Sequence, residues 1–214
     1  MGWSFGIFTD GVSCEYHQEI VSSIKKTVSE NYEIVFVTEN RAFHSSEKVL
    51  YVDVPCMNPI SSLHCTKKNF FSFHALYDNI CMMHDYIKLD ENFVQSFEQF
   101  GDDWDVCSIP LVLPDGNRWW DWRIEGHPIY GSSLVSYDCP PSVYHFVTGN
   151  LFMVKRNFIM KYPMIDPYGG SEDLGWSRSV NNHWRYRLNK NTKAFSLRQK
   201  DIDPRQYLNS NLII

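Results

Sequence analysis

Long apolar segments are missing from this sequence of 214 residues. Its longest apolar runs are the size of a β-strand, far short of the ~20 residues that cross a bilayer as a helix. The amino-terminal sequence "MGWSFGIFTDG" also lacks the charged region and the long apolar region of a signal peptide. We therefore expect no membrane span and a cytoplasmic location.

Basic runs are absent as well, and the formal net charge is −5. A protein that binds nucleic acid along its phosphates needs a basic surface, so we expect no nucleic-acid partner. The acidity does not exclude a polyanionic substrate, because a bound cation can reverse the local field.

Several nucleotide and metal motifs are also missing. The six cysteines show no C-x-x-C or other zinc-ligand spacing. We predict reduced thiols, with Cys81 and Cys107 behaving as small hydrophobes inside apolar runs. No G-x-G-x-x-G follows the first predicted strand and no P-loop is present, which disfavours dinucleotide and Walker-type sites.

The sequence does contain enough apolar residues for a sizeable core, with 43% hydrophobic and 15% aromatic residues. In the first half, β-branched runs alternate with a segment of helical periodicity, which favours parallel strands joined by a crossover helix. The predicted strands there are 3–8, 32–40, 48–55 and 79–86, and the predicted helices are 15–30, 66–78 and 91–101.

The second half predicts strands 104–113, 144–156 with a break at Gly149, and 193–202, and a helix within 169–184. Residues 115–142 are rich in Gly, Pro, Trp and Tyr without a period, and long loops of this kind are usually functional. We predict one α/β domain over residues 1–214. It has a Rossmann-like, mostly parallel central sheet flanked by helices.

Polar residues close the predicted strands, where ligands bind in open α/β sheets. Thr9, Asp10 and Gly11 follow the first strand, Glu39 lies at the end of the second, and His84 and Asp85 lie at the end of the fourth. His84 and Asp85 offer N and O ligands for a divalent cation, and carboxylate with water suits Mg²⁺ or Mn²⁺. In the alternative reading, Asp85 caps the next segment and His84 forms hydrogen bonds in the core.

The order of five motifs resembles the nucleotide-sugar glycosyltransferases of the GT-A fold. These motifs are "IFTDG", "FVTEN", "MHDY", "VTGNLFMVKR" and "YGGSEDLGWSRSV", and the resemblance covers most of residues 4–187. It implies a GT-A-like fold, with a nucleotide-binding part over about 1–90 and an acceptor and catalytic part over about 91–214. In that family, a D-x-D or H-x-D-like signature ends the central strand and holds the metal that bridges the donor diphosphate.

The signature departs from the family pattern, because Met83 stands where the first aspartate is expected. The resemblance then implies that Mn²⁺ or Mg²⁺ depends on Asp85 and His84, the diphosphate, water and a distant histidine. His145 and His127 are the candidates for that histidine.

The resemblance also implies the donor-binding residues. Thr9, Asp10, Gly11 and Glu39 match positions that hold the base and ribose, although turn chemistry explains them equally well. Lys67, Lys68 and Asn69 could contact phosphate or ribose, or the lysines could be a solvated pair.

Attack by a sugar hydroxyl needs a general base, and a carboxylate at a helix N-terminus suits that task. Glu172 and Asp173 stand at such a place behind Gly169 and Gly170. The resemblance favours Asp173, over the anomeric carbon, in an inverting displacement. Simple helix capping is the alternative.

The aromatic segment could bind the acceptor, because aromatic rings stack on sugars and carboxylates hold hydroxyls. Its members are Trp119, Trp120, Asp121 and Trp122, beside Arg123. A tryptophan-rich loop folded over the core is the alternative.

Together these features predict a metal-dependent hexosyltransferase that moves a sugar from a nucleotide diphosphate donor, such as a UDP-sugar, to a glycan hydroxyl. The segments "ALYDNICMMHDYI" and "DGNRWWDW" resemble the small domains that chloroviruses encode for capsid glycans, which would place the chain in the host cytoplasm. A nucleotidyltransferase is one alternative, although "FTDGVSC" makes a poor glycine-rich phosphate loop. A non-catalytic carbohydrate-binding module that uses the tryptophans is the other.

Overall fold

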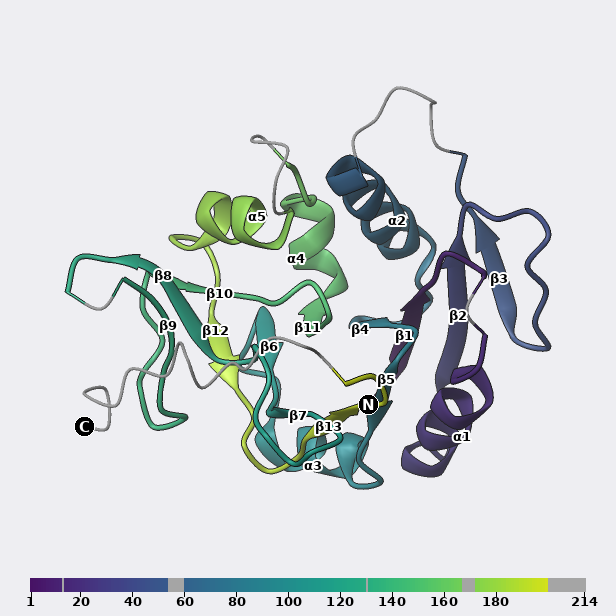
Figure 1. Cartoon of the computed structure of the whole chain (residues 1–214), viewed down its shortest axis with the longest axis horizontal. Coiled ribbons are helices and arrows are strands. Elements are labelled where there is room, and N and C mark those ends of the chain that lie inside the picture. The colour runs from purple at the N-terminus through teal and green to yellow at the C-terminus, as the bar shows by residue number, and fades with distance from the viewer. Residues whose placement is uncertain (13, 54–59, 130, 167–171, 200–214) are drawn as a thin grey trace.

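The computed structural model describes residues 1–12, 14–53, 60–129, 131–166 and 172–199, and Figure 1 shows the arrangement. Its central sheet contains β1 (Trp3–Phe8), β2 (Tyr32–Thr38), β3 (Lys48–Tyr51), β4 (Asn79–His84), β6 (Val106–Ser108), β11 (Leu151–Lys155) and β12 (Tyr186–Leu188). The helices are α1 (His17–Thr27), α2 (Ile60–His74), α3 (Phe93–Phe100), α4 (Arg156–Lys161) and α5 (Glu172–Val180). One small sheet contains β8 (Arg123–His127), β9 (Gly131–Leu134) and β10 (His145–Phe146), and the other β5 (Ile87–Leu89), β7 (Leu111–Val112) and β13 (Ala194–Ser196).

The central sheet has the order β12-β6-β11-β4-β1-β2-β3. Strand β1 runs parallel to both β2 and β4, and Ile7 pairs with Phe36 on one side and Met83 on the other. Strand β11 runs antiparallel to β4 and β6. The prediction of a mostly parallel sheet is confirmed, and the carboxyl ends of β1, β2 and β4 meet at one edge.

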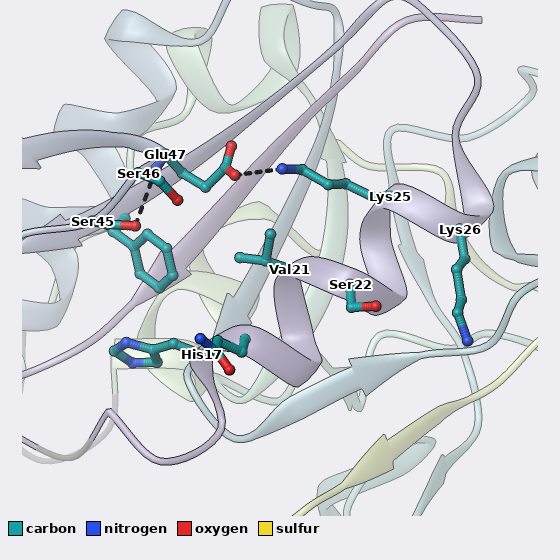
Figure 2. A pocket seen from close by; sticks show the side chains of 10 residues that line it. His17, Val21, Ser22, Lys25, Lys26, Ser45, Ser46 and Glu47 are labelled. Carbon is teal, nitrogen blue, oxygen red and sulfur yellow. Dashed lines mark hydrogen bonds and ion pairs between the residues drawn. The ribbon is translucent and has the colours of Figure 1, made fainter.

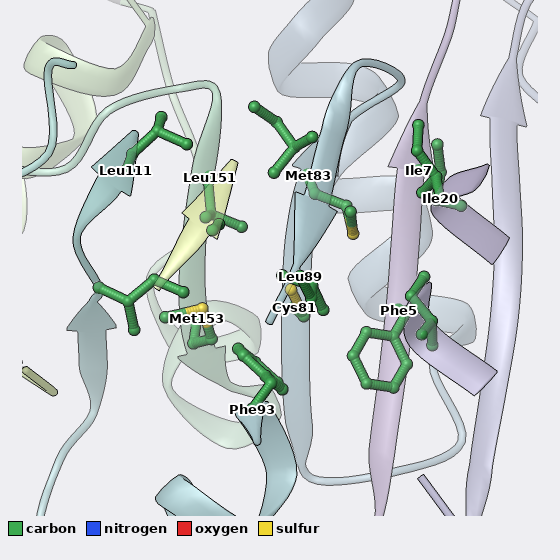
Figure 3. Close-up of a cluster of buried hydrophobic side chains, with 14 of the residues drawn as sticks. Phe5, Ile7, Ile20, Cys81, Met83, Leu89, Phe93, Leu111, Leu151 and Met153 are labelled. Atoms are coloured by element: carbon green, nitrogen blue, oxygen red, sulfur yellow. The ribbon is translucent and has the colours of Figure 1, made fainter. Parts of the chain in front are cut away.

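Side-chain alternation along β4 divides the core into two layers. Cys81 and Met83 pack on the side covered by α1 and α3, whereas Ile80 and Met82 pack on the side covered by α2, α4 and α5. Figure 3 shows the first layer, where Ile20 of α1 and Phe93 of α3 lie with side chains of β1, β4 and β11. Because successive strand residues point to opposite faces, a run of apolar residues buries both faces of the sheet.

Helix α2 lies close against β1 because residue 6 is glycine. A Cβ atom at position 6 would overlap the ring of Phe71 from α2. Phe71 is fully buried in the layer between α2 and the sheet. This packing brings the first two turns of α2 toward the polar ends of β1, β2 and β4, where the candidate site lies.

Three predicted elements differ from the structure. The predicted strand 104–113 is split into β6 and β7, which join different sheets on either side of Pro110. Residues 115–142 contain the antiparallel pair β8–β9 rather than only a loop. Helix α2 begins at Ile60, earlier than predicted, and ends at His74. The strands β5 and β12 and the helix α4 were not predicted.

The described cysteines carry free thiols, and Cys65, Cys81 and Cys107 are buried, as predicted for Cys81 and Cys107. Cys56 lies outside the described residues. Among the helices that the structure describes, none is long and apolar enough to cross a membrane.

Candidate functional site

A cavity of about 310 Å³ lies at the carboxyl edge of β1, β2 and β4. Its lining comes from the ends of these strands, the first turns of α2 and the segment after β13. The lining residues are Phe8, Thr9, Asp10, Glu39, Leu63, His64, Lys67, His84, Asp85, Tyr86 and Arg198. The cavity therefore joins polar strand ends that were predicted separately from the sequence.

The turn after β1 needs glycine at position 11. Gly11 has φ +73°, and its carbonyl accepts a hydrogen bond from Asn40 Nδ2 at 3.2 Å. A Cβ atom there would lie 2.9 Å from the Asn40 Cβ. The Gly11 amide donates to Thr9 Oγ1 at 3.0 Å, and Asp10 Oδ1 accepts from the Val12 amide at 2.8 Å. These residues thus form the turn that was the alternative interpretation of their sequence, and the turn's hydrogen bonds hold Asp10 on the cavity wall.

Lys67 connects α2 to the ends of β1 and β2. Its ammonium group donates to the Thr9 carbonyl at 2.8 Å and forms an ion pair with Glu39. The Lys67 side chain is only 4% exposed, whereas that of Glu39 is 35% exposed. Lys67 is therefore not a solvated surface lysine, and Glu39 keeps an accessible carboxylate beside the cavity.

His84 and Asp85 do not point to the same place, although the sequence analysis grouped them as metal ligands. The His84 ring lies 5.9 Å from the ring of His64 on α2. Asp85 instead lies on the α1 side, where its Oδ2 is 3.8 Å from His17 Nε2. Strand β4 ends at His84, and Asp85 lies in the turn that follows, so the two residues line the same cavity from different sides.

Tyr86 and Arg198 close the cavity beside β4. The Tyr86 hydroxyl donates to Asn150 Oδ1 at 3.0 Å, and the Arg198 guanidinium lies 5.1 Å from the centre of the Tyr86 ring. Burial raises the pKa of Tyr86 to about 12, although the nearby Arg198 opposes this shift. Tyr86 is therefore a neutral hydrogen-bonding group at physiological pH. The sequence analysis missed Arg198, whose position depends on the path of the chain after β13.

The two predicted catalytic carboxylates flank Gly149, in the turn between β10 and β11. Asp173 Oδ2 accepts a hydrogen bond from the Gly149 amide at 2.9 Å. Lys68, which is fully buried, forms an ion pair with Glu172 Oε1 at 3.0 Å. A Cβ atom at position 149 would lie 2.9 Å from Glu172 Oε1, so a larger residue there would displace the Glu172 side chain. Gly169 and Gly170, which precede these carboxylates in the sequence, lie outside the described residues.

His64 of α2 lines the cavity, and burial lowers its pKa, while the charge of Glu172 opposes that shift and Lys68 adds to it. The neighbouring residues Lys67 and Lys68 of the same helix pair with Glu39 and Glu172, so α2 links the strand ends to the start of α5. The sequence analysis did not single out His64, because it lies in a helix with a weak apolar period.

Arg123 is a further residue that the sequence analysis left without a role of its own. Its guanidinium lies 3.8 Å from the centre of the Phe146 ring and 5.3 Å from that of Trp120. Arg123 Nη2 is 3.4 Å from Asp173 Oδ2. Burial lowers the Arg123 pKa, and the charge of Asp173 opposes this shift. Arg123 therefore links the aromatic segment to the carboxylate pair.

Asn69, predicted to bind donor, is absent from the cavity lining. Its Nδ2 donates to the Met164 carbonyl and its Oδ1 accepts from the Met164 amide, both at 2.8 Å. We expect Asn69→Ala to lower the free energy of unfolding by about 1–3 kcal/mol, because both Met164 groups lose a partner. Thermal melting measures this loss. Unchanged UDP affinity would accompany it if Asn69 is structural, whereas weaker UDP binding with normal stability would support the donor role.

Most of the aromatic segment is in the core rather than on an acceptor platform. Trp119, Asp121 and Trp122 are 6%, 3% and 1% exposed, so their rings and carboxylate are covered by protein. Trp120 is partly exposed, and it lies beside Arg123. This burial also removes the main feature that favoured a carbohydrate-binding module.

The two distant histidines lie away from Asp85. His145 is buried on β10, 4.3 Å from the Trp122 ring, and burial lowers its pKa to about 4. His127 ends β8, with its ring 4.7 Å from that of Tyr144. Neither residue lines the cavity that contains Asp85. Packing in the small sheet accounts for both positions.

Among the described residues, no three carboxylate, imidazole or thiol side chains gather as a ready-made metal site. Asp85 nevertheless supplies a mostly buried carboxylate to a cavity that has room for phosphate. Mg²⁺ commonly binds through one or two carboxylates together with substrate phosphates and water. The donor set therefore fits a cation that enters with a diphosphate, and it does not fit an all-protein cage.

Comparison with known proteins places the fold. No protein-family model and no curated protein matches the sequence. Residues 1–349 of S. aureus TarS superpose with a TM-score of 0.66 at 12% identity, over 92% of this chain and 60% of TarS. GalNAc-T7, solved with UDP, GalNAc and Mn²⁺, gives 0.64 at 12% identity, over 94% of this chain and 44% of that protein.

The fold is GT-A-like. TarS has also been solved with UDP-GlcNAc, and that complex gives a TM-score of 0.64 at 11% identity, over 98% of this chain and 62% of TarS. A197 from STIV gives 0.51 at 14% identity, over 93% of this chain and 87% of A197. The chain thus spans less than two thirds of TarS and GalNAc-T7. At these identities the likeness concerns the fold alone.

Proposed function

We propose that this chain is a glycosyltransferase that moves a hexose from a UDP-sugar to a glycan hydroxyl. The observation that carries the proposal is the position of two neighbouring lysines of α2 at the carboxyl edge of a GT-A-like sheet. Lys67 pairs with Glu39 in the wall of a cavity that also contains Asp10 and Asp85, and Lys68 pairs with Glu172 beside Asp173. The TarS complex with UDP-GlcNAc and the GalNAc-T7 complex with UDP, GalNAc and Mn²⁺ support this choice of donor.

In this proposal the cavity holds the nucleotide. Asp10 and Glu39 bind the base and ribose beside the Thr9–Gly11 turn, and Asp85 faces the diphosphate. A bound Mn²⁺ or Mg²⁺ would neutralise charge on the leaving diphosphate. Arg198 is positively charged and lines this cavity, and it forms no ion pair among the described residues. Its guanidinium group can therefore contact a phosphate of the donor.

The chemical step belongs to the carboxylate pair. Asp173 takes the proton of the acceptor hydroxyl as that oxygen bonds to the anomeric carbon. The bond from that carbon to the diphosphate oxygen breaks in the same displacement, so the configuration inverts. Lys68 holds Glu172, and the Gly149 amide orients Asp173. Trp120 lies on the acceptor side through its contact with Arg123. A capsid glycan in the host cytoplasm is the acceptor that the resemblance suggests.

Asp85→Ala should remove the metal-stimulated part of UDP binding while the protein stays folded. The reason is the loss of the carboxylate that faces the diphosphate, and we expect UDP affinity in Mn²⁺ to fall at least about tenfold. Titration calorimetry with and without Mn²⁺ measures it. Asp102→Ala is the matched control, because Asp102 is 71% exposed and pairs with Lys155 outside the cavity. Equal UDP affinity in Asp85→Ala and wild type would contradict the metal role of Asp85.

The same titrations test the function itself. Wild-type protein should bind UDP and slowly hydrolyse UDP-GlcNAc or UDP-GalNAc in Mn²⁺. Absence of binding and of hydrolysis with every nucleotide sugar would reject the glycosyltransferase, whereas pyrophosphate release from a nucleoside triphosphate would favour the nucleotidyltransferase.

A further inference from the structure

His17 has a buried nitrogen that finds no hydrogen-bond partner among the residues that the structure describes. The residue begins α1 and is 9% exposed. Its ring packs 4.8 Å from the Phe36 ring and 5.4 Å from the Phe43 ring, measured between centroids. Figure 2 shows the ring pointing away from Lys25 and Lys26 of the same helix. Within the described part of the chain, His17 Nε2 has no hydrogen-bond partner, and unsatisfied buried polar atoms are uncommon in folded proteins.

Asp85 is the group that this nitrogen faces. His17 Nε2 lies 3.8 Å from Asp85 Oδ2, and the two side chains are only 11% and 14% exposed. This distance is too long for a direct hydrogen bond. Two coordinate bonds of about 2.1 Å together exceed it, so one ion can contact both atoms. One metal ion can therefore bind the His17 nitrogen and the Asp85 carboxylate together.

We infer that His17 Nε2 is the second protein ligand, with Asp85, of the divalent cation that accompanies the donor. The inference rests on the proposed function, because that cation belongs to the donor diphosphate. His17 lines a second cavity beside α1, and it reaches the donor cavity through its approach to Asp85. His84 also lines the donor cavity but lies against His64 on the α2 side, so we assign the second ligand to His17. The sequence places His17 far from "MHDY", which is why the sequence analysis looked for the distant histidine elsewhere.

A nitrogen ligand has a consequence for the identity of the metal. Mg²⁺ prefers oxygen ligands, whereas imidazole suits transition ions and Mn²⁺ accepts carboxylate and water as well. The His17–Asp85 pair therefore selects Mn²⁺ over Mg²⁺. An all-oxygen site at Asp85 would lack this preference.

His17→Phe is the variant that isolates the nitrogen, because it keeps an aromatic ring against Phe36 and Phe43. Its Mn²⁺ affinity, measured by electron paramagnetic resonance with Mn²⁺ alone and with Mn²⁺ and UDP, should fall at least about tenfold. Mg²⁺ should then compete with Mn²⁺ more effectively than in wild type. His74→Gln is the control, since His74 is exposed at the end of α2, and its Mn²⁺ affinity should equal that of wild type.

Thermal melting separates lost ligation from lost packing. His17→Gln is measured in parallel with His17→Phe, so the test still works if one of the two variants fails to fold. Two folded His17 variants with wild-type Mn²⁺ affinity and wild-type Mg²⁺ competition would overturn the ligand assignment, and the proposed function would stand if UDP still binds. Mn²⁺ binding that depends on His17 and Asp85 in a protein that binds no nucleotide would support the metal site and overturn the proposed function.

Discussion

Asp173→Asn should lower turnover at least about a hundredfold, because loss of a general base typically costs 10²–10⁴-fold in rate. The amide has nearly the shape of the carboxylate but cannot accept the acceptor proton. Its oxygen can still accept from the Gly149 amide, which Asp173 Oδ2 now does at 2.9 Å. We therefore expect UDP affinity close to that of the wild type. The melting temperature should fall, because Arg123 loses its ion pair with Asp173 and the new NH₂ group faces the Leu174 amide, from which Asp173 Oδ1 now accepts. Steady-state kinetics with a UDP-sugar, together with UDP titration, check this.

Glu172→Gln is the matched control for that variant. Glu172 pairs with the buried Lys68, so its loss should lower stability more than Asp173→Asn and turnover less. If Asp173→Asn stays active while folded Glu172→Gln loses turnover, the base is Glu172. If both variants keep wild-type turnover, the two carboxylates are structural and only stabilise the start of α5.

The central sheet could be predicted because its local signals agree with one another. The runs that became β1, β2 and β4 are mostly apolar and are buried at nearly every position, which suits strands covered on both faces. The period of α1 is clear, with Ile20 and Ile24 buried against the sheet. The hairpin β8–β9 was missed because Gly126 and Gly131 and exposed polar residues interrupt any alternation there. The sequence of this hairpin therefore lacks the alternation of apolar and polar residues from which its strands could be predicted.

The sequence predicted site residues best where the topology of the sheet alone fixes their positions. Asp10, Glu39 and Asp85 follow parallel neighbouring strands, so their proximity follows from the sheet order. His17 and Arg123 belong to other elements, and only side-chain packing brings them to Asp85 and Asp173. Composition likewise cannot distinguish a tryptophan that binds sugar from one that fills the core. Burial of the aromatic segment had to come from the structure.

Asp121→Asn should be the most destabilising conservative change in the aromatic segment. Asp121 Oδ1 accepts from Arg118 Nε and the Trp122 amide, each at 2.6 Å. Its Oδ2 accepts from the Leu111 amide at 2.9 Å and the Tyr137 hydroxyl at 2.5 Å. Burial raises the Asp121 pKa, and the Arg118 guanidinium opposes this shift. A carboxylate that accepts four hydrogen bonds thus joins the segment between β7 and β8 to β7 and to Tyr137 beyond β9.

An asparagine at position 121 would place an NH₂ group against one pair of these donors and leave Arg118 without its buried partner. Breaking a buried ion pair from one side typically costs about 3–5 kcal/mol. In a chain of this size, that loss lowers the melting temperature by roughly 6–20 °C. Asp138→Asn is the control, because Asp138 is 75% exposed and its ion pair with Lys190 should contribute at most about 1 kcal/mol. A normal melting temperature for Asp121→Asn, with sugar transfer lost and donor hydrolysis retained, would contradict the structural role and support an acceptor-binding role for Asp121.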